Sequence, residues 1–341
     1  MIFPLFLFAA FRGNGNGDYF AYLDRGVYIS TIQDVLYNRK IGMEIGYRWI
    51  VYVVRLLRLP RQFVVVFMNA ISFSCIATFI KRYSKDWCLS LLLFIPLFFQ
   101  FDMHAARAAV AIGFCAVGFK YIKERKFVKY IATIVIACMF HLSALISIPL
   151  YFFYGKRIKL KSGLLILMVE LLVIRFLGIY TLMARLFTLL HLDYFAEKLI
   201  AYTSSETYGY TMNLYDPRIW IGIFVFLFSC TTVPEKNEDE IFMTNAVFMY
   251  SFILILFSNT TFFAYRLSAF YYIYILLLIP SIVLKYHYHS ANEYGYMSHY
   301  SERIRLFYFF SMIFSVLNMF YARIMIEYKT VFETGSGLLN Y

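Results

Sequence analysis

About ten apolar runs, most of them near the ~20 residues that carry a helix across a bilayer, follow one another along this chain of 341 residues. Hydrophobic residues make up 62% of the chain and charged residues 15%, which leaves too little polar surface to cover a soluble core. Lipid is therefore the expected solvent, and helices satisfy their own backbone groups in lipid. We predict an all-α fold, a single polytopic transmembrane helical bundle of about 10–11 membrane segments. The apolar runs are 1–11, 62–80, 87–101, 104–122, 128–153, 162–180, 218–233, 241–258, 266–284 and 304–322.

Short basic clusters separate these runs and set the orientation of the bundle. The formal net charge is +12, and Lys and Arg next to membrane segments favour the cytoplasmic side. Because no basic stripe lies on a soluble element, this charge predicts membrane lipid as a partner and no nucleic acid. The clusters lie at 81–85, 120–129 and 156–161, with a weaker one at Lys285, Arg303 and Arg305.

The segment 128–153 has basic clusters at both ends. A single straight crossing would place these two clusters on opposite sides of the membrane and reverse the orientation of every later cluster. We therefore predict a break near His141, with two short helices whose outer ends both face the cytoplasm. Broken helices of this kind are tolerated inside a protein-lined cavity.

Two polar stretches are long enough to form outer loops. Loop 12–61 holds an amphipathic stretch, Glu44–Leu59, and we expect it to be the first periplasmic loop. Loop 187–217 is rich in Tyr, Ser and Thr and would be the second; it suits either sugar binding or simple capping of a cavity. The start, 1–11, lacks the basic residues and cleavage site of a signal peptide, so we expect a short first helix there.

Arg107 and Arg266 lie at the ends of apolar segments, and the topology above places both on the outer side. Arginine at membrane depth is costly, which makes it a functional candidate; snorkelling to the interface is the alternative. Two arginines that face one cavity can grip a pyrophosphate through bidentate, charge-assisted bonds.

Three further residues are candidates for a general base. Asp18 and Glu44 in the first loop could accept a proton from a sugar hydroxyl. His141 falls at the predicted break, with Ser143 close by, and an imidazole could act as a base or as a donor to phosphate. A solvated loop acid and a packing histidine are the alternatives, and the sequence does not select one of the three.

Neither a cofactor nor a metal is expected. The five cysteines form no CxxC pair, so neither a zinc site nor a disulfide framework is indicated. The pattern Gly13-x-Gly15-x-Gly17 lacks the preceding strand and the spacing of a nucleotide-binding loop. Glu170 and Arg175 lie five residues apart in one segment, which is not the spacing of a helical pair, so we expect each to find its partner elsewhere.

A set of short motifs occurs in a fixed order along the chain. They are Arg12 with Gly17-Asp18-Tyr19 and Tyr22, Glu44-x-Gly46-Tyr47-Arg48, Arg107 with Ala111, Phe140-His141-x-Ser143-Ala144-Leu145, and Arg266 with Phe270 and Pro280. This set resembles the EpsG family of Wzy-like O-antigen and exopolysaccharide polymerases. Five further residues become candidates for substrate binding: Arg12, Tyr22, Tyr47, Arg48 and Ser143.

The resemblance implies a multi-pass, GT-C-like glycosyltransferase of the bacterial inner membrane that needs no cofactor. Such polymerases transfer a growing glycan from one undecaprenyl-pyrophosphate carrier to the terminal sugar of a second lipid-linked oligosaccharide at the periplasmic face. Whether a chain-length regulator is a further partner is a question that the sequence leaves open. An O-antigen ligase and a lipid-linked oligosaccharide flippase remain alternatives, although flippases often show two related halves and no internal repeat is visible here.

Overall fold

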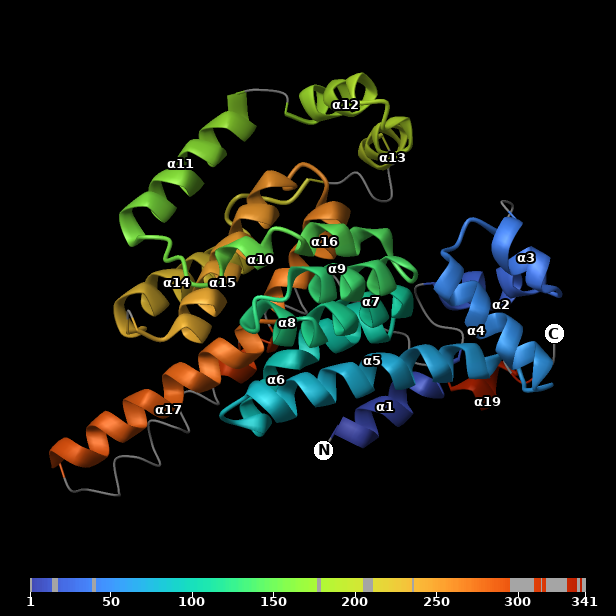
Figure 1. The fold of residues 1–341 in the computed structure, drawn as a ribbon, viewed down its shortest axis with the longest axis horizontal. Helices are drawn as coiled ribbons and strands as arrows, with labels where there is room; N and C mark the ends of the chain where they lie inside the picture. Colours follow the sequence, from blue (N-terminus) through green and yellow to red (C-terminus); the bar gives the residue numbers. More distant parts are fainter. Residues whose placement is uncertain are drawn as a thin grey trace. The chain divides into compact units, whose positions relative to one another are not determined.

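The chain is helical throughout the residues that the structure describes (Figure 1). The structure is a computed structural model, and it describes residues 2–13, 18–38, 41–176, 179–204, 211–234, 236–294, 310–313, 315–316, 330–335 and 338. Within these ranges the only β-type contact is an isolated bridge between Arg12 and Thr330. This agrees with the predicted all-α class, whereas the GT-C-like arrangement stays a prediction. Gly15, Gly17 and most of the run predicted at 304–322 lie outside the described residues.

The helices form two compact units, residues 1–151 with 279–341 and residues 152–278. The first unit starts with α1 (Ile2–Ala10), α2 (Tyr19–Gly26), α3 (Ile32–Tyr37), α4 (Ile45–Leu56) and the long α5 (Gln62–Tyr83). It continues with α6 (Trp87–Leu97), the π-helical turn η2 (Phe98–Asp102), α7 (Ala106–Val117), α8 (Phe119–Lys123), α9 (Phe127–Cys138), the 3₁₀ helix η3 (Leu142–Ser147) and, near the C-terminus, α19 (Val331–Thr334).

The second unit contains α11 (Leu160–Phe176), α12 (Ile179–Leu189), α13 (Asp193–Thr203), α14 (Pro217–Thr232), α15 (Glu238–Leu256) and α16 (Thr261–Tyr272). Two helices, α10 (Leu150–Phe153) and α17 (Ile275–Tyr294), cross the boundaries between the units. Gly222 on α14 sets a close approach to α15, because a Cβ there would come within 2.3 Å of the Ser251 hydroxyl oxygen.

In the first unit, α5 packs along α7, and α7 packs on α9 (Figure 1). Gly113 on α7 permits this approach, because a Cβ there would come within 2.8 Å of the Cys75 Cβ on α5. The Ser72 hydroxyl on α5 donates to the buried Asp102 carboxylate at 2.8 Å. A polar contact inside an apolar core is costly unless it is satisfied, so this bond fixes the end of η2 against α5.

Helix α4 confirms the amphipathic stretch that was predicted from Glu44. Its buried residues recur at helical spacing, whereas Trp49 and Val53 are 38% and 39% exposed. The buried side is formed by Gly46, Tyr47, Ile50, Val51 and Val54.

The chain also breaks where the charge clusters predicted a break. Helix α9 ends at Cys138, η3 begins at Leu142, and His141 between them has an extended backbone. The Tyr130 hydroxyl donates to the Ser147 carbonyl at 2.6 Å and holds η3 against α9. That both outer ends of this hairpin face the cytoplasm stays a prediction.

Two of the described helices, α5 and α15, are long and apolar enough to cross a membrane. The pair α16 and α17 makes a third if it is counted as one span, bent by 46°. Shorter apolar helices lie at Trp87–Asp102, Phe127–Cys138, Leu142–Phe153 and Pro217–Thr232. The predicted total of membrane segments goes beyond this count and stays a prediction.

Candidate functional site

Arg107, in the first turn of α7, lies between two acidic residues from the first loop. Its Nη1 donates a hydrogen bond to Glu44 Oε2, and its Nη2 lies 3.8 Å from Asp18 Oδ2. The arginine side chain is 13% exposed, and those of Asp18 and Glu44 are 31% and 25% exposed. Charge-assisted bonds of this kind are stronger than neutral ones. One largely buried cation therefore holds both candidate carboxylates, which remain partly exposed.

Tyr22 on α2 contacts both Asp18 and Arg107. Its hydroxyl donates to Asp18 Oδ2 at 3.3 Å and accepts the backbone N–H of Arg107 at 3.4 Å. The Arg107 guanidinium carbon lies 5.7 Å from the centre of the Tyr22 ring, within the range of a cation–π contact. Burial, and then the neighbouring Asp18 charge, raise the pKa of Tyr22 to about 12. Tyr22 therefore stays a neutral donor that orients Asp18.

Helix α4 places Glu44 by two close contacts. The Tyr47 hydroxyl donates to the Tyr22 carbonyl, and the two rings lie 5.7 Å apart. The Gly46 N–H donates to the Met139 carbonyl at 2.6 Å, so the start of α4 touches the break that follows α9. A Cβ on Gly46 would come within 2.7 Å of that carbonyl oxygen. Only glycine permits this approach, which brings Glu44 beside the break.

His141 is the N-cap residue of η3 and is half-buried. Its Nδ1 accepts the Ser143 N–H at 3.3 Å, which caps the helix. Arg107, Asp18 and Glu44 together form what we call the acidic cluster. The contact between Gly46 and Met139 brings the His141 segment to the edge of this cluster. The predicted neighbours His141 and Ser143 are thus joined to each other, and their catalytic and binding roles stay predictions.

Arg12 is 3% exposed, and its backbone is fixed from two sides. The Gln62 side-chain amide donates to the Arg12 carbonyl at 2.9 Å, and the Phe11 carbonyl accepts the Val331 N–H at 3.0 Å. None of the three guanidinium nitrogens has a hydrogen-bond partner within the part of the chain that the structure describes. Asp102 and Asp18 act on this guanidinium electrostatically, but a buried cation without hydrogen bonds is still costly, so it is suited to receive an anion.

Arg48, another predicted substrate-binding residue, bonds to two backbone carbonyls, and its binding role stays a prediction. Its Nε donates to the Met43 carbonyl at 2.7 Å and its Nη1 donates to the Val35 carbonyl at 3.2 Å. These bonds tie the loop before α4 to the helix itself. Arg48 therefore shapes the loop that presents Glu44.

Arg266 lies on α16 in the second unit. Its guanidinium carbon stacks at 3.9 Å over the Phe262 ring, and among the described residues it makes no ion pair. Arg107 belongs to the first unit, so the predicted pairing of these two arginines on one face stays a prediction. Arg266 therefore carries a guanidinium that stacking holds in place and that pairs with no carboxylate of the described residues.

A buried cluster beside Arg266 was not foreseen from the sequence. Arg218 is 3% exposed and grips Asp216 with two nitrogens, one of them at 2.6 Å. Its guanidinium carbon lies 3.8 Å from the centre of the Tyr265 ring. The Asp-Pro-Arg sequence at the start of α14 signals a capped helix, but the partner ring on α16 could not be read from it.

Within the described ranges no group of three His, Cys, Asp or Glu residues is arranged to hold a metal ion.

Glu170 on α11 is 7% exposed, and neither of its carboxylate oxygens has a hydrogen-bond partner among the described residues. The side chain of Arg175 lies outside the described residues, so its predicted partner is untested.

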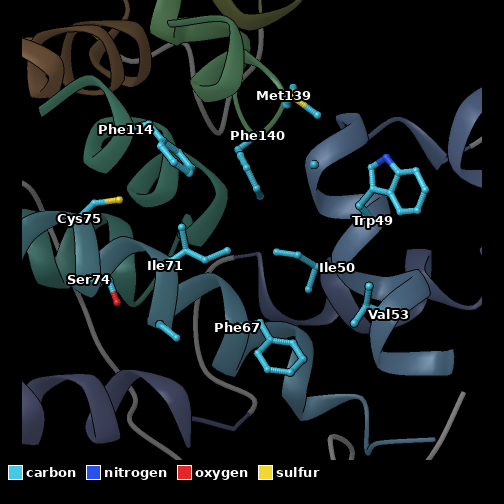
Figure 2. Close-up of a pocket in the computed structure, with 12 residues that line it drawn as sticks. Trp49, Ile50, Val53, Phe67, Ile71, Ser74, Cys75, Phe114, Met139 and Phe140 are labelled. Atoms are coloured by element: carbon cyan, nitrogen blue, oxygen red, sulfur yellow. The ribbon is translucent and has the colours of Figure 1, made fainter. Parts of the chain in front are cut away.

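An open groove of about 670 Å³ lies between α4 and α5 (Figure 2). One wall is α4 and the other is α5, with Phe114 of α7 and the Met139–Phe140 segment at one end. Gly46, two residues after Glu44, belongs to its lining. The sequence showed the apolar residues but not that they surround a groove.

These features define a helical membrane protein in which Arg107 of α7 and the carboxylates of Asp18 and Glu44 form a polar cluster beside an apolar groove. The chain belongs to the EpsG family, whose family model matches residues 1–330. It is therefore a membrane protein of polysaccharide biosynthesis. No curated protein and no solved structure matches the chain.

Proposed function

We propose that this protein is a membrane glycosyltransferase that polymerises undecaprenyl-pyrophosphate-linked oligosaccharide repeat units into O-antigen or exopolysaccharide at the periplasmic face of the bacterial inner membrane. The family supports the class of pathway. The observation that carries the specific reaction is the position of Arg107 between Glu44 and Asp18. Three elements far apart in the chain converge to hold two carboxylates next to one cation.

This cluster is suited to activate an acceptor sugar. Glu44 or Asp18 takes the proton of the acceptor hydroxyl while its oxygen attacks the anomeric carbon of the donor glycan. The bond between that carbon and the pyrophosphate oxygen breaks, and its electron pair leaves with the undecaprenyl pyrophosphate. Direct displacement of this kind inverts the anomeric configuration. Arg107 and Tyr22 keep the carboxylates in place, and such positioning can supply much of the rate.

The charge of the leaving pyrophosphate needs cations that are not already neutralised. Arg107 is engaged by two carboxylates, whereas the Arg12 guanidinium has no hydrogen-bond partner and Arg266 has no ion pair among the described residues. We assign Arg12 to the pyrophosphate and Arg107 mainly to orientation of the base, and a contact of Arg266 with the pyrophosphate stays a prediction from the sequence. Preorganised cations that meet developing charge are a large source of rate enhancement.

The test is the polymer ladder of cells that carry single variants. Arg107→Ala and Arg266→Ala should each leave the protein in the membrane and abolish long chains, so that only single repeat units remain. Arg58→Ala, an exposed arginine of the same outer loop, is the matched control and should give a normal ladder. A normal ladder from both Arg107→Ala and Arg266→Ala would overturn the proposal.

The phenotype of a deletion strain separates the alternatives. Loss of a polymerase leaves single repeat units on the lipid A core, and loss of a ligase leaves none. Loss of a flippase accumulates lipid-linked units on the cytoplasmic side. Only the first result agrees with the proposed reaction.

A further inference from the structure

The side chain of Gln62, at the start of α5, joins the end of α1 to the start of α2. Its amide nitrogen donates to the Ala10 carbonyl at 2.6 Å and to the Arg12 carbonyl at 2.9 Å. Its amide oxygen accepts the Tyr19 hydroxyl at 2.7 Å. Gln62 is 3% exposed, and a buried amide is costly unless its polar atoms are satisfied. These bonds therefore hold both chain segments against α5.

The partners of Gln62 fix the orientation of its amide. A backbone carbonyl only accepts hydrogen bonds, so the two N–H groups face Ala10 and Arg12 and the oxygen faces the Tyr19 hydroxyl. The reversed amide would set its oxygen against two carbonyl oxygens. Methionine has a similar length and no N–H group, so Gln62→Met removes these bonds with little change in volume.

Three consecutive carbonyls at the end of α1 are held by residues far along the chain. The last carbonyls of a helix have no partner within the helix. Gln62 supplies donors to two of them, those of Ala10 and Arg12. The Val331 N–H donates to the third, that of Phe11, at 3.0 Å. The Arg12 guanidinium has no hydrogen-bond partner in the described ranges, so the position of Arg12 is set through its backbone.

The other end of the Gln62 contact lies next to Asp18. Tyr19, which bonds to the Gln62 amide, directly follows Asp18 in the chain and is buried. The Asp18 N–H donates to the His104 carbonyl at 3.0 Å, which adds a second anchor. Gln62 therefore links the residue assigned to the pyrophosphate, Arg12, with one of the candidate bases.

We propose that Gln62 is a positioning residue that, together with the Val331 N–H, holds the Arg12 guanidinium where it meets the donor pyrophosphate, at a fixed place relative to Asp18. This rests on the proposed function for the roles of Arg12 and Asp18. Gln62 acts through the Arg12 backbone and not on the substrate. A displacement of about 1 Å can cost about 100-fold in rate, so loss of the Gln62 bonds should weaken the grip on pyrophosphate even though the cation remains.

Binding of undecaprenyl pyrophosphate to the full-length protein in lipid nanodiscs tests this role. We expect Gln62→Met to raise the Kd at least about tenfold. Asn69→Leu is the matched control, because Asn69 is a buried amide of the same helix that donates to the Val65 carbonyl of α5 itself. It should leave the Kd unchanged. A wild-type Kd in Gln62→Met, or an equal rise in both variants, would overturn the proposal.

A double-mutant cycle with Arg12→Gln separates positioning from a general structural effect. If Gln62 acts through Arg12, then Gln62→Met should raise the Kd less than about twofold in the Arg12→Gln protein, whereas independent effects would multiply. A further rise of about tenfold in that background would show that Gln62 does not act through Arg12.

Val331→Pro gives a test that leaves α5 unaltered and that decides the question if Gln62→Met does not fold. Val331 is the first residue of α19, a helix position that favours proline, and Thr330 before it already has an extended backbone. The substitution removes the N–H that bonds to Phe11, and we expect the Kd to rise about threefold. Val331→Ala keeps the N–H and should bind as the wild type does. Equal Kd values for these two variants would contradict the role of the carbonyl bonds.

These binding measurements stand apart from polymer formation. If the cycle gives the expected result but the wild-type protein makes no polymer from lipid-linked units, the proposed reaction fails while the positioning role stands. If polymer forms but Gln62→Met binds undecaprenyl pyrophosphate as the wild type does, the positioning role alone fails. A wild-type protein that binds no undecaprenyl pyrophosphate would overturn both.

Discussion

Gly46→Ala perturbs the contact that places Glu44, and its effect can be worked from the structure. The new Cβ would lie 2.7 Å from the Met139 carbonyl oxygen and 3.0 Å from two Phe140 ring atoms, so the start of α4 must move away from the break. Overpacking of this kind costs about 1–3 kcal/mol, and stretching the 2.6 Å bond from the Gly46 N–H to Met139 costs about 1 kcal/mol more.

The expected consequence for activity is larger than that for stability. A displacement of about 1 Å in a catalytic group can lower a rate by about 100-fold, and Glu44 lies only two residues from the clash. We therefore expect Gly46→Ala to fold, with a lower melting temperature, and to lose about 100-fold in polymerisation rate per folded molecule.

The assay compares thermal stability in detergent with polymer yield from lipid-linked repeat units. Gly163→Ala is the matched control, because its Cβ would lie 2.7 Å from the Phe226 ring in the second unit, whereas Asp18, Glu44 and Arg107 belong to the first unit. It should lose similar stability but keep its rate per folded molecule. Equal rates for the two variants would refute the reasoning that links the close approach at Gly46 to catalysis.

Three further substitutions test other parts of the account. Tyr22→Phe removes the hydroxyl that joins Asp18 to the Arg107 N–H. We expect the variant to lose about 1–3 kcal/mol of stability in thermal unfolding and to show a lower initial velocity of polymerisation. An unchanged velocity would contradict the orienting role of Tyr22. Arg12→Gln should raise the KM for the lipid-linked donor at least about tenfold. Arg12→Lys keeps the charge and should therefore show a smaller increase in KM. A wild-type KM in the Gln variant would exclude Arg12 from the donor site. Arg218→Leu should leave the Asp216 carboxylate buried without its partner and destabilise the protein by about 3–5 kcal/mol. Size-exclusion chromatography should then show a loss of folded protein. A wild-type elution profile would show that the pair is not structural.

Local sequence signals predicted the helices and one of their interruptions well. The apolar runs anticipated α5, α7, α9 and α15 because a helix in lipid is specified by a continuous apolar stretch. The break at His141 followed from charge alone, since one straight crossing would have placed two basic clusters on opposite sides. The amphipathic α4 followed from its helical spacing of apolar residues.

The candidate site was predictable in its members but not in its arrangement. Glu44 and Arg107 lie 63 positions apart, and their contact depends on how α2, α4 and α7 pack, which no local pattern encodes. For the same reason the Arg218–Tyr265 contact and the groove beside Gly46 were not foreseen. The predicted role of Arg107 in holding a pyrophosphate stays a prediction, and the structure adds that Asp18 and Glu44 lie next to its guanidinium.

The most direct test of the proposed reaction uses purified protein in a lipid bilayer with one defined undecaprenyl-pyrophosphate repeat unit as the only substrate. The wild-type protein should produce a ladder of longer lipid-linked glycans and release one undecaprenyl pyrophosphate for each new linkage, and the double variant Asp18→Asn with Glu44→Gln should produce neither. A wild-type protein that leaves the substrate as single units, or a double variant that elongates it at the wild-type rate, would contradict the proposal.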